Sequence, residues 1–258
     1  MTISTRSKFY YGYTVDQDNQ AIDFNEGAGE LQASLNIGNY TMTELAVEVA
    51  RALTAAGTQE YSCSVNRDDR KYTISATSNF DLLFISGTRS AVSAKELLGY
   101  TTDQLLQNSY TSANSTGNEY KPQFLLQDYV TPDDFREANF ASINESASGI
   151  VEVVRFGIRK FFEFNITFVT NIAQGLDAPI ENNAQGVEEA RAFLQFITDK
   201  NKFEFMPDRN NTATYYKILV EKTAGSSKGT GYRLKELYTK NLAGYYETGK
   251  TQFRLIED

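Results

Sequence analysis

The feature that most constrains the fold is an alternation of apolar and polar residues near position 165. Large apolar residues take every second position and polar residues lie between them: Phe162, Glu163, Phe164, Asn165, Ile166, Thr167 and Phe168. Successive side chains of a β-strand point to opposite faces, so a period of two predicts a half-buried strand. The second half of the chain is therefore expected to be organised around a β-sheet.

Further strands and one helix are predicted around this segment. The strands are expected at 150–156, 203–206, 215–220 and 252–256. A helix is expected at 187–200, because Val187, Ala190, Leu194 and Ile197 share one helical face. A shorter helix should begin at 131–134, with Pro132 at its first position. Residues 121–258 are thus predicted to form a mainly antiparallel β-sandwich or barrel with one packed helix.

The first half predicts a smaller α+β module with a helix in its middle. Thr41 and Glu44 have the spacing of a capping box, in which the two side chains satisfy each other's backbone amides. The helix that follows should end at Gly57, a residue suited to a left-handed cap. Its buried face comprises Leu45, Val49 and Leu53. A second capping-box pattern at 93–96 predicts a short helix that ends at Gly99.

Strands are expected on both sides of the central helix. Alternation at 31–37 predicts a half-buried strand that turns at Gly38-Asn39, and 80–85 is predicted to be another strand. Alternation at 61–65 and 72–76 around the polar residues 67–70 predicts a hairpin. Residues 108–118 are rich in Ser, Thr and Asn without apolar periodicity, which predicts an exposed loop or linker. The expected domains are 1–120 and 121–258.

The charge of the chain disfavours nucleic-acid binding. The net charge is −8, and residues 1–128 hold nine basic and 15 acidic side chains, a balance of −6 that leaves −2 for the rest. No Lys or Arg occurs from Phe9 to Ala50. Such a surface repels a phosphate backbone, so we expect no specific nucleic-acid binding.

Several chemistries are excluded by residue counts. The chain has no His and a single Cys, which rules out imidazole-dependent hydrolysis, histidine-ligated metals and an internal disulfide. Cys63 takes an apolar position of an alternating strand and is expected to be a small buried hydrophobe. No apolar run approaches the length of a membrane span, and the N-terminus lacks the apolar stretch of a secretory signal. We expect no cofactor, no membrane span and synthesis in the cytoplasm.

Two motifs resemble functional sites but fit them poorly. The acidic stretch 16–23 lacks the Gly and the Glu of a calcium loop, because Ala21 and Gly27 stand at those positions, so an exposed acidic turn is favoured. In the glycine-rich segment 225–231, Lys228 precedes Gly229, whereas a phosphate loop needs Ser or Thr there. That segment is interpreted as a flexible loop that orders when a partner docks.

Acidic pairs leave one catalytic alternative open. Asp133-Asp134 and Glu188-Glu189 stand at predicted helix starts, where the helix dipole already explains them. A carboxylate-based glycosidase remains the weakest functional hypothesis, because the separation of two carboxylates is not readable from sequence.

Aromatic doublets are the more informative pattern. They occur at Tyr10-Tyr11, Phe161-Phe162, Tyr215-Tyr216 and Tyr245-Tyr246. Adjacent strand residues face opposite sides, so only one ring of each doublet can enter a one-sided core. The doublets indicate either strands covered on both faces or a large sandwich with helices outside it.

These segments together resemble a known class of viral protein. The second half, through 144–149, 153–156, 162–168, 187–200, 203–208 and 245–249, resembles minor tail and distal-tail proteins of long-tailed bacteriophages. The first half, through 38–41, 44–45, 52–53, 72–75 and 97–100, is similar to small α+β modules of virion structural proteins. The resemblance implies a tail-tube-like fold, assembly into rings and no catalytic residues.

The resemblance implies interfaces instead of an active site. Ring-forming edges of the β unit and the loops 171–186 and 225–231 would contact neighbours, and the expected interface residues are Tyr215, Tyr245, Lys228 and Phe161. The leading hypothesis is a non-enzymatic tail-tip or baseplate component of the virion, assembled in the host cytoplasm. Its expected partners are further copies of itself, the tail tube, the baseplate hub and other tail proteins. A carbohydrate- or receptor-binding module is the alternative, because exposed Tyr beside Asn and Gln also binds sugars.

Overall fold

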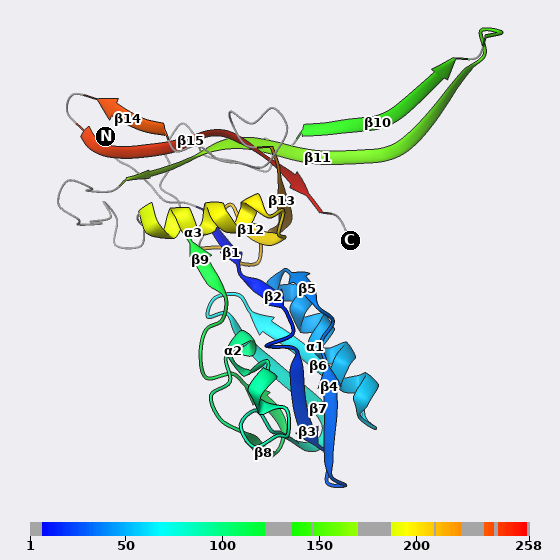
Figure 1. Ribbon diagram of the computed structural model, residues 1–258, viewed down its shortest axis with the longest axis vertical. Coiled ribbons are helices and arrows are strands. Elements are labelled where there is room, and N and C mark those ends of the chain that lie inside the picture. The colour runs from blue at the N-terminus through cyan, green and yellow to red at the C-terminus, as the bar shows by residue number, and fades with distance from the viewer. Residues whose placement is uncertain are drawn as a thin grey trace. The chain divides into compact units, whose positions relative to one another are not determined.

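The protein is a β-rich α+β structure with two compact units. The computed structural model (Figure 1) describes residues 7–121, 136–145, 147–169, 187–208, 210–222, 235–239 and 242–256. Within these residues most strands pair antiparallel, and there are three α-helices. The sheet unit comprises Met1–Phe9, Tyr120–Asn201 and Phe205–Asp258, and the module comprises Tyr10–Glu119 and Lys202–Glu204. A short piece of the second half therefore belongs to the module.

The module is built on a five-stranded sheet with the order β4-β3-β7-β6, to which β8 adds by pairing with β7. Its strands are β3 (Ala21–Asn25), β4 (Glu30–Ser34), β6 (Tyr61–Asn66), β7 (Lys71–Leu82) and β8 (Gln104–Thr111). A separate pair is formed by β2 (Tyr13–Val15) and β5 (Gly38–Tyr40). The helices are α1 (Met42–Ala56), which packs on β6 and β4, α2 (Lys95–Leu98) and the 3-10 turn η1 (Ser90–Val92).

Helix α1 begins where the sequence predicts. The Thr41 N–H donates to the Glu44 carboxylate at 2.9 Å and the Glu44 N–H donates to Thr41 Oγ1 at 3.3 Å, so the capping box is confirmed. Leu45, Val49 and Leu53 are fully buried as expected. The helix also ends at Gly57, but Gly57 is extended (φ −96°, ψ −175°) and not left-handed.

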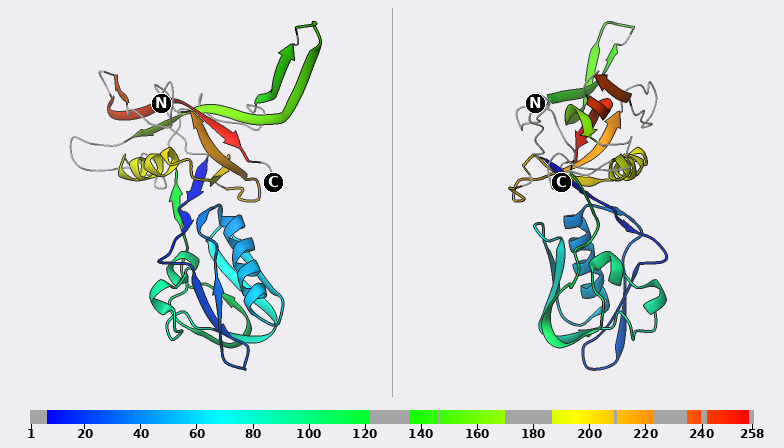
Figure 2. Two further views of the ribbon diagram at one scale, coloured as in Figure 1. Left: turned by 45° about the vertical axis from the view of Figure 1, so that its right-hand side comes forward. Right: turned by 90° about the vertical axis from the view of Figure 1, so that its left-hand side faces the viewer.

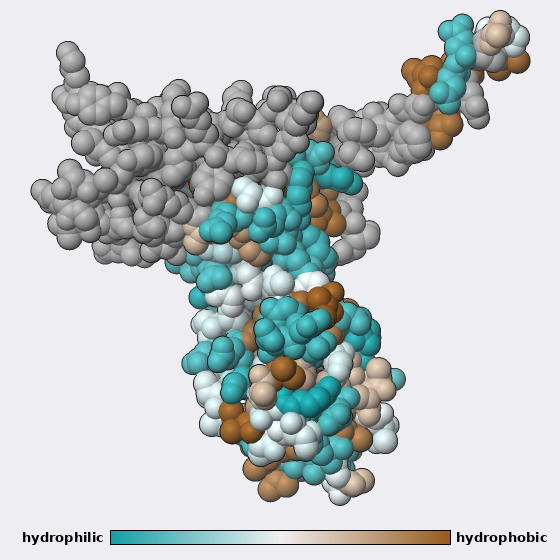
Figure 3. All heavy atoms as spheres, viewed as in Figure 1, coloured by the Kyte–Doolittle hydropathy of each residue, from teal (hydrophilic) through white to brown (hydrophobic). Residues whose placement is uncertain are grey.

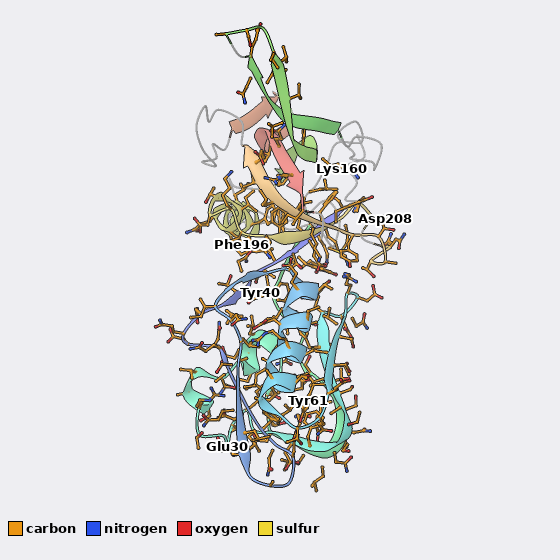
Figure 4. The ribbon with its side chains drawn as sticks, turned by 90° about the vertical axis from the view of Figure 1, so that its right-hand side faces the viewer. Glu30, Tyr40, Tyr61, Lys160, Phe196 and Asp208 are labelled. Carbon is orange, nitrogen blue, oxygen red and sulfur yellow. The ribbon has the colours of Figure 1, made fainter. Side chains whose placement is uncertain are left out.

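Close contact explains the glycine at the end of α1. A Cβ at Gly57 would lie 2.5 Å from the Glu26 carboxylate, which accepts hydrogen bonds from Thr58 and, at 2.9 Å, from the Tyr61 hydroxyl. Tyr61 is labelled in Figure 4 beside the helix. The residue is thus small because a carboxylate packs against it.

The strands around α1 follow the predicted pattern, with corrections at 80–85 and at 37–39. The hairpin of β6 and β7 is confirmed, with Tyr61 opposite Ala76 and Asn66 opposite Lys71. The predicted strand at 80–85 is the end of β7, which stops at Leu82. Gly38-Asn39 lies in β5 and not in a turn, because this segment pairs with β2, and Ile37 is exposed.

A further correction concerns the start of α2. Its N-cap is Ala94, which has no side-chain hydrogen bond, so the second capping box is wrong. The helix does end at Gly99, as the sequence predicts, and Gly99 takes the left-handed conformation (φ 79°).

The loop predicted at 108–118 is confirmed for residues 112–117, whereas both ends of the segment are strands. Its first residues belong to β8, and its last residue begins β9 (Asn118–Tyr120). The side chains of Tyr110, Ser112 and Thr116 are buried. Ser112 Oγ accepts from the Tyr72 N–H at 3.1 Å, and Thr116 Oγ1 donates to the Arg70 carbonyl at 2.8 Å. Hydroxyl groups that resemble a linker in composition are used here to satisfy buried backbone groups.

Glu204 completes the module from the second half of the chain. Its side chain is fully buried and accepts hydrogen bonds from Thr43 N at 3.1 Å, Thr43 Oγ1 at 2.9 Å and Arg67 Nε at 3.1 Å. The Thr43 N–H lies in the first turn of α1, where backbone N–H groups have no acceptor within the helix. The helix dipole also favours a negative charge at this position. Glu204 therefore stabilises the start of α1 and neutralises Arg67.

The sheet unit contains the longest strands. Its strand order is β10-β11-β15-β13-β12-β1-β9, with β14 paired to β15. The bounds are β1 (Lys8–Tyr11), β10 (Arg136–Glu145), β11 (Val151–Val169), β12 (Phe203–Met206), β13 (Tyr216–Lys222), β14 (Lys235–Thr239) and β15 (Leu242–Leu255). The strands predicted at 150–156 and 162–168 are one continuous strand of 19 residues. The helix start predicted at 131–134 lies outside the described residues.

An aromatic cluster forms the core of the sheet unit. The Phe9 ring stacks on Phe193 at 4.8 Å and on Phe205 at 5.1 Å, and Tyr120 stacks on Phe193 at 4.8 Å. Phe193 lies on α3 (Val187–Thr198), where the predicted burial of Leu194 and Ile197 is confirmed. These rings pack α3 against β1, β9 and β12, which are also hydrogen-bonded neighbours in the sheet.

Replacing Glu204 should destabilise the protein strongly. In Glu204→Ala the buried start of α1 and the Arg67 guanidinium lose their anion, so the free energy of unfolding should fall by about 3 kcal/mol. Urea titration followed by circular dichroism measures the change. The matched control is Glu60→Ala at an exposed position, for which a change within about 0.5 kcal/mol is expected. Equal effects of the two variants would contradict the role of Glu204.

Acid should destabilise the module through Glu48 and Asp103. Burial raises the pKa of Glu48, but hydrogen bonds from Arg51 and the Asn36 N–H lower it by more, so its pKa lies below the usual value. The pKa of Asp103 is lowered in the same way, with burial outweighed by bonds from the Ser86 and Ile85 amides.

A lowered pKa in the folded state fixes the sign of the pH dependence. The stabilisation is present above the unfolded pKa of about 4 and is lost as the pH falls through the lower folded pKa. Urea titrations at neutral and acidic pH should therefore show a smaller decrease on acidification for Glu48→Gln than for the wild type. An unchanged decrease would contradict the contribution of Glu48, and Glu60→Gln is the control expected to behave like the wild type.

Candidate interaction surface

The most distinctive surface is a two-stranded ribbon formed by β10 and the first half of β11, residues 136–145 and 151–160. The two strands pair from Glu137 opposite Lys160 to Glu145 opposite Val151, with one irregularity between Phe140 and Ala141. Both views of Figure 2 show the ribbon extending beyond the other strands of the sheet unit. Lys160, near its base, is labelled in Figure 4.

Among the residues that the structure describes, no further strand pairs with the outer edges of the ribbon. Strand β10 ends the sheet, and β15 first pairs with β11 at Phe161. Within the described residues, the β11 segment 152–159 therefore has β10 as its one strand neighbour. Open edges present rows of backbone groups on which another strand can pair. A two-stranded ribbon is also at best marginally stable in water without a further contact.

The far end of the ribbon exposes apolar side chains. Ile143 is 70% exposed and Val153 is 51% exposed, and the two lie directly opposite each other on one face. Three more apolar residues near them are exposed: Ile150, Val151 and Val154. Figure 3 shows these hydrophobic spheres at the end of the ribbon. β-branched residues favour strands, and Gly149 takes the left-handed conformation (φ 78°) that the turn requires.

The two edges differ in formal charge. Strand β10 contains Arg136, Glu137 and Glu145, a balance of −1. The β11 segment of the ribbon contains Glu152, Arg155, Arg159 and Lys160, a balance of +2. Pairing β10 of one copy with the β11 segment of another would therefore bring together strands of opposite formal charge.

The four residues expected at an interface do not form one cluster. Phe161 is half-buried and lies opposite Arg254 on β15. Tyr245 also lies on β15, but opposite Val169 at the other end of β11. Tyr215 is half-buried and directly precedes β13. Lys228 lies outside the described residues. Of the four, Phe161 stands where the ribbon joins the rest of the sheet.

The aromatic doublets differ among themselves. Both rings of Tyr10-Tyr11 are buried, so the strand is covered on both faces at this point. Tyr215 and Tyr216 are both half-buried. The exposed Ile and Val residues of the ribbon carry a stronger interface signal, which appears in sequence only as a β-branched run after Gly149.

Carboxylates in the described residues serve structural roles. Asp23 is buried and binds Arg89, with Nε and Oδ1 2.8 Å apart, as Glu204 binds Arg67. The Asp16 turn is exposed and closed by its own hydrogen bonds, including Asp18 N to Asp16 Oδ1 at 2.9 Å. Across the described parts of the chain, no group of three or more acidic or Cys residues is placed to bind a metal.

Cys63 shows no sign of activation. It is partly buried in β6, and burial raises the pKa of its thiol to about 12. The acidic pairs at 133–134 and 188–189 and the segment 225–231 have no described side chains. Burial therefore keeps the Cys63 thiol in its protonated form, which is a poor nucleophile.

Comparison with known proteins adds no relative. No protein-family model matches the chain, and no curated protein is significantly similar to it. Among the helices that the structure describes, none is long and apolar enough to cross a membrane.

Substitutions on the ribbon should leave the isolated chain stable. Ile143→Ser and Val153→Thr remove exposed apolar groups, so each should change the free energy of unfolding by at most about 0.5 kcal/mol in dilute, monomeric samples. Val220→Thr is the matched core variant, because Val220 is fully buried, and it should lose about 1–3 kcal/mol. Similar losses at Val153 and Val220 in urea titrations would show that the ribbon is part of the core.

Proposed function

We propose that this chain is a non-enzymatic structural protein of a phage tail that assembles into a closed ring. Its position would be the distal tail or baseplate, where the ring links the tail tube to the receptor-binding apparatus. The observation that carries the proposal is the β10–β11 ribbon, with open edges of opposite charge and exposed Ile143 and Val153. Exposed apolar patches of this kind are typical of protein interfaces.

Head-to-tail pairing explains both edges at once. If β10 of one copy pairs antiparallel with the β11 segment of the next, each ribbon gains a strand on both sides. Repeating the register within the chain would place Ile143 beside Val153 of the adjacent copy. Such a contact joins two different surfaces, so it produces a ring when the rotation closes.

The resemblance to distal-tail proteins supports the same reading. It implies a tail-tube-like sandwich or barrel, of which the long antiparallel strands β11 and β15 would form part. The acidic module would then be an addition to the ring-forming unit. Its surface would face solvent or a DNA channel, because a negative lining prevents DNA from adhering.

A carbohydrate-binding module is the second candidate. Asn210 and Asn211 are exposed beside the half-buried Tyr215 and Tyr216, a combination of amide and aromatic groups that can bind sugars. Glycan-array binding by the monomeric chain would favour this function. Glycan binding should then be weaker in Tyr215→Ala than in the wild type.

Mass photometry and negative-stain microscopy test the ring directly. The wild type should form closed particles of one size, and the double variant with Ile143→Lys and Val153→Lys should remain monomeric because charge opposes edge pairing. The control Ile143→Val with Val153→Ile keeps apolar, β-branched side chains and should assemble. A wild type that stays monomeric, alone and with other tail proteins, would overturn the proposal.

A further inference from the structure

The module exposes a second apolar feature at Leu105 and Leu106 on β8. Leu106 is 76% exposed, and Leu105 beside it is also exposed. Leu106 also has a positive φ of 63°, a conformation that costs a leucine roughly 1–2 kcal/mol. A large apolar residue is thus held both exposed and strained, with no compensating burial in the module itself.

Specific hydrogen bonds maintain this strained conformation. The Leu106 N–H donates to Asp81 Oδ1 at 2.7 Å. The next amide, of Gln107, donates to the Tyr110 hydroxyl at 2.6 Å, which donates in turn to the Phe80 carbonyl at 2.5 Å. Tyr110 is buried, so the support is fixed to the core. Strain that the surrounding structure maintains in this way is typical of functional surfaces.

Negative charge borders the two leucines. Asp81 lies against Leu106, and Asp103 precedes the pair and accepts the Ile85 N–H at 2.6 Å. Backbone amides hold both carboxylates but do not neutralise them. Ile85 is itself exposed and extends the apolar area. We call Ile85, Leu105 and Leu106 with these two acids the leucine patch.

A complementary area lies on α1. Val47 is 66% exposed, and Arg51, one turn later on the same helix face, has a side chain that is 45% exposed. Arg51 binds Glu48 at 2.6 Å, and the guanidinium is the exposed member of this pair because Glu48 is buried. Ile37 is exposed and follows Asn36, whose N–H donates to the same Glu48. We call Ile37, Val47 and Arg51 the helix patch.

We infer that the leucine patch of one copy docks on the helix patch of the next copy. Both areas are apolar, one is bordered by carboxylates and the other by a guanidinium, so they are complementary in charge as well as in hydropathy. The patches lie on different elements, β8 and α1, and the contact is therefore head-to-tail like the ribbon contact. This inference rests on the proposed ring and adds a second contact, between modules.

Cysteine cross-linking tests the contact in the full chain. Leu106→Cys and Val47→Cys are made separately in a Cys63→Ala background, mixed and oxidised. A disulfide-linked dimer should form in the mixture and not in either variant alone, because the contact joins two different patches. Leu106→Cys mixed with Asp18→Cys, at an exposed turn, is the control expected to remain unlinked.

A glycine substitution separates docking from folding. Leu106→Gly removes the side chain and suits a positive φ, so the module should stay folded by circular dichroism. The contact would then lose the leucine side chain that docking buries, so assembly should weaken at least about tenfold in mass-photometry dilution series. Val47→Ser should weaken it to a similar extent.

The outcomes separate this inference from the proposed function. Rings that form without the mixed cross-link, or equally well in Leu106→Gly, would overturn the module contact and leave the ring intact. A wild type that never assembles and never cross-links would overturn both. Cross-links as strong in Leu106→Cys alone as in the mixture would show a symmetric contact and contradict the head-to-tail arrangement.

Discussion

Backbone hydrogen bonding is the constraint on which the arrangement of this protein depends. The core strands of the sheet unit have neighbours on both sides, and the Phe9 cluster fixes them to α3. The ribbon lies outside that protection, because β10 and the 152–159 segment of β11 each have one strand neighbour within the described residues. Ile143 and Val153 add exposed apolar surface at the same place. Pairing with another copy would satisfy the edges and bury these side chains together.

In the module, unlike in the ribbon, buried polar groups find hydrogen-bond partners within the same unit. Glu204 caps the start of α1, Arg89 neutralises Asp23, and the hydroxyls of Ser112 and Thr116 bond to buried backbone. Such networks hold a structure rigid when every member has a partner. A rigid module can keep Leu106 in a strained conformation, so that a docking partner need not order it first.

Local signals in the sequence predicted much of the fold. Thr41 and Glu44 gave the start of α1, and alternation gave the hairpin of β6 and β7, because both depend on neighbouring residues. The burial of Ser112 and Thr116 within the predicted loop was missed, because their hydroxyls bond to residues that are distant in sequence, such as Tyr72 and Arg70. The ribbon could not be recognised either, since alternation predicts a strand but not whether a second strand covers its edge. Phe161, Tyr215 and Tyr245 were predicted at an interface because of their aromatic rings. Whether a ring is exposed depends on tertiary structure, which the local sequence does not contain.

Hydrogen–deuterium exchange of the ribbon amides tests edge pairing most directly. The account predicts that amides in 136–145 and 152–159 exchange rapidly in dilute monomer and become protected at concentrations where rings form, while the Phe9 core is protected in both. Equal exchange of the ribbon amides in monomer and assembled particles would contradict the claim that these edges build the ring.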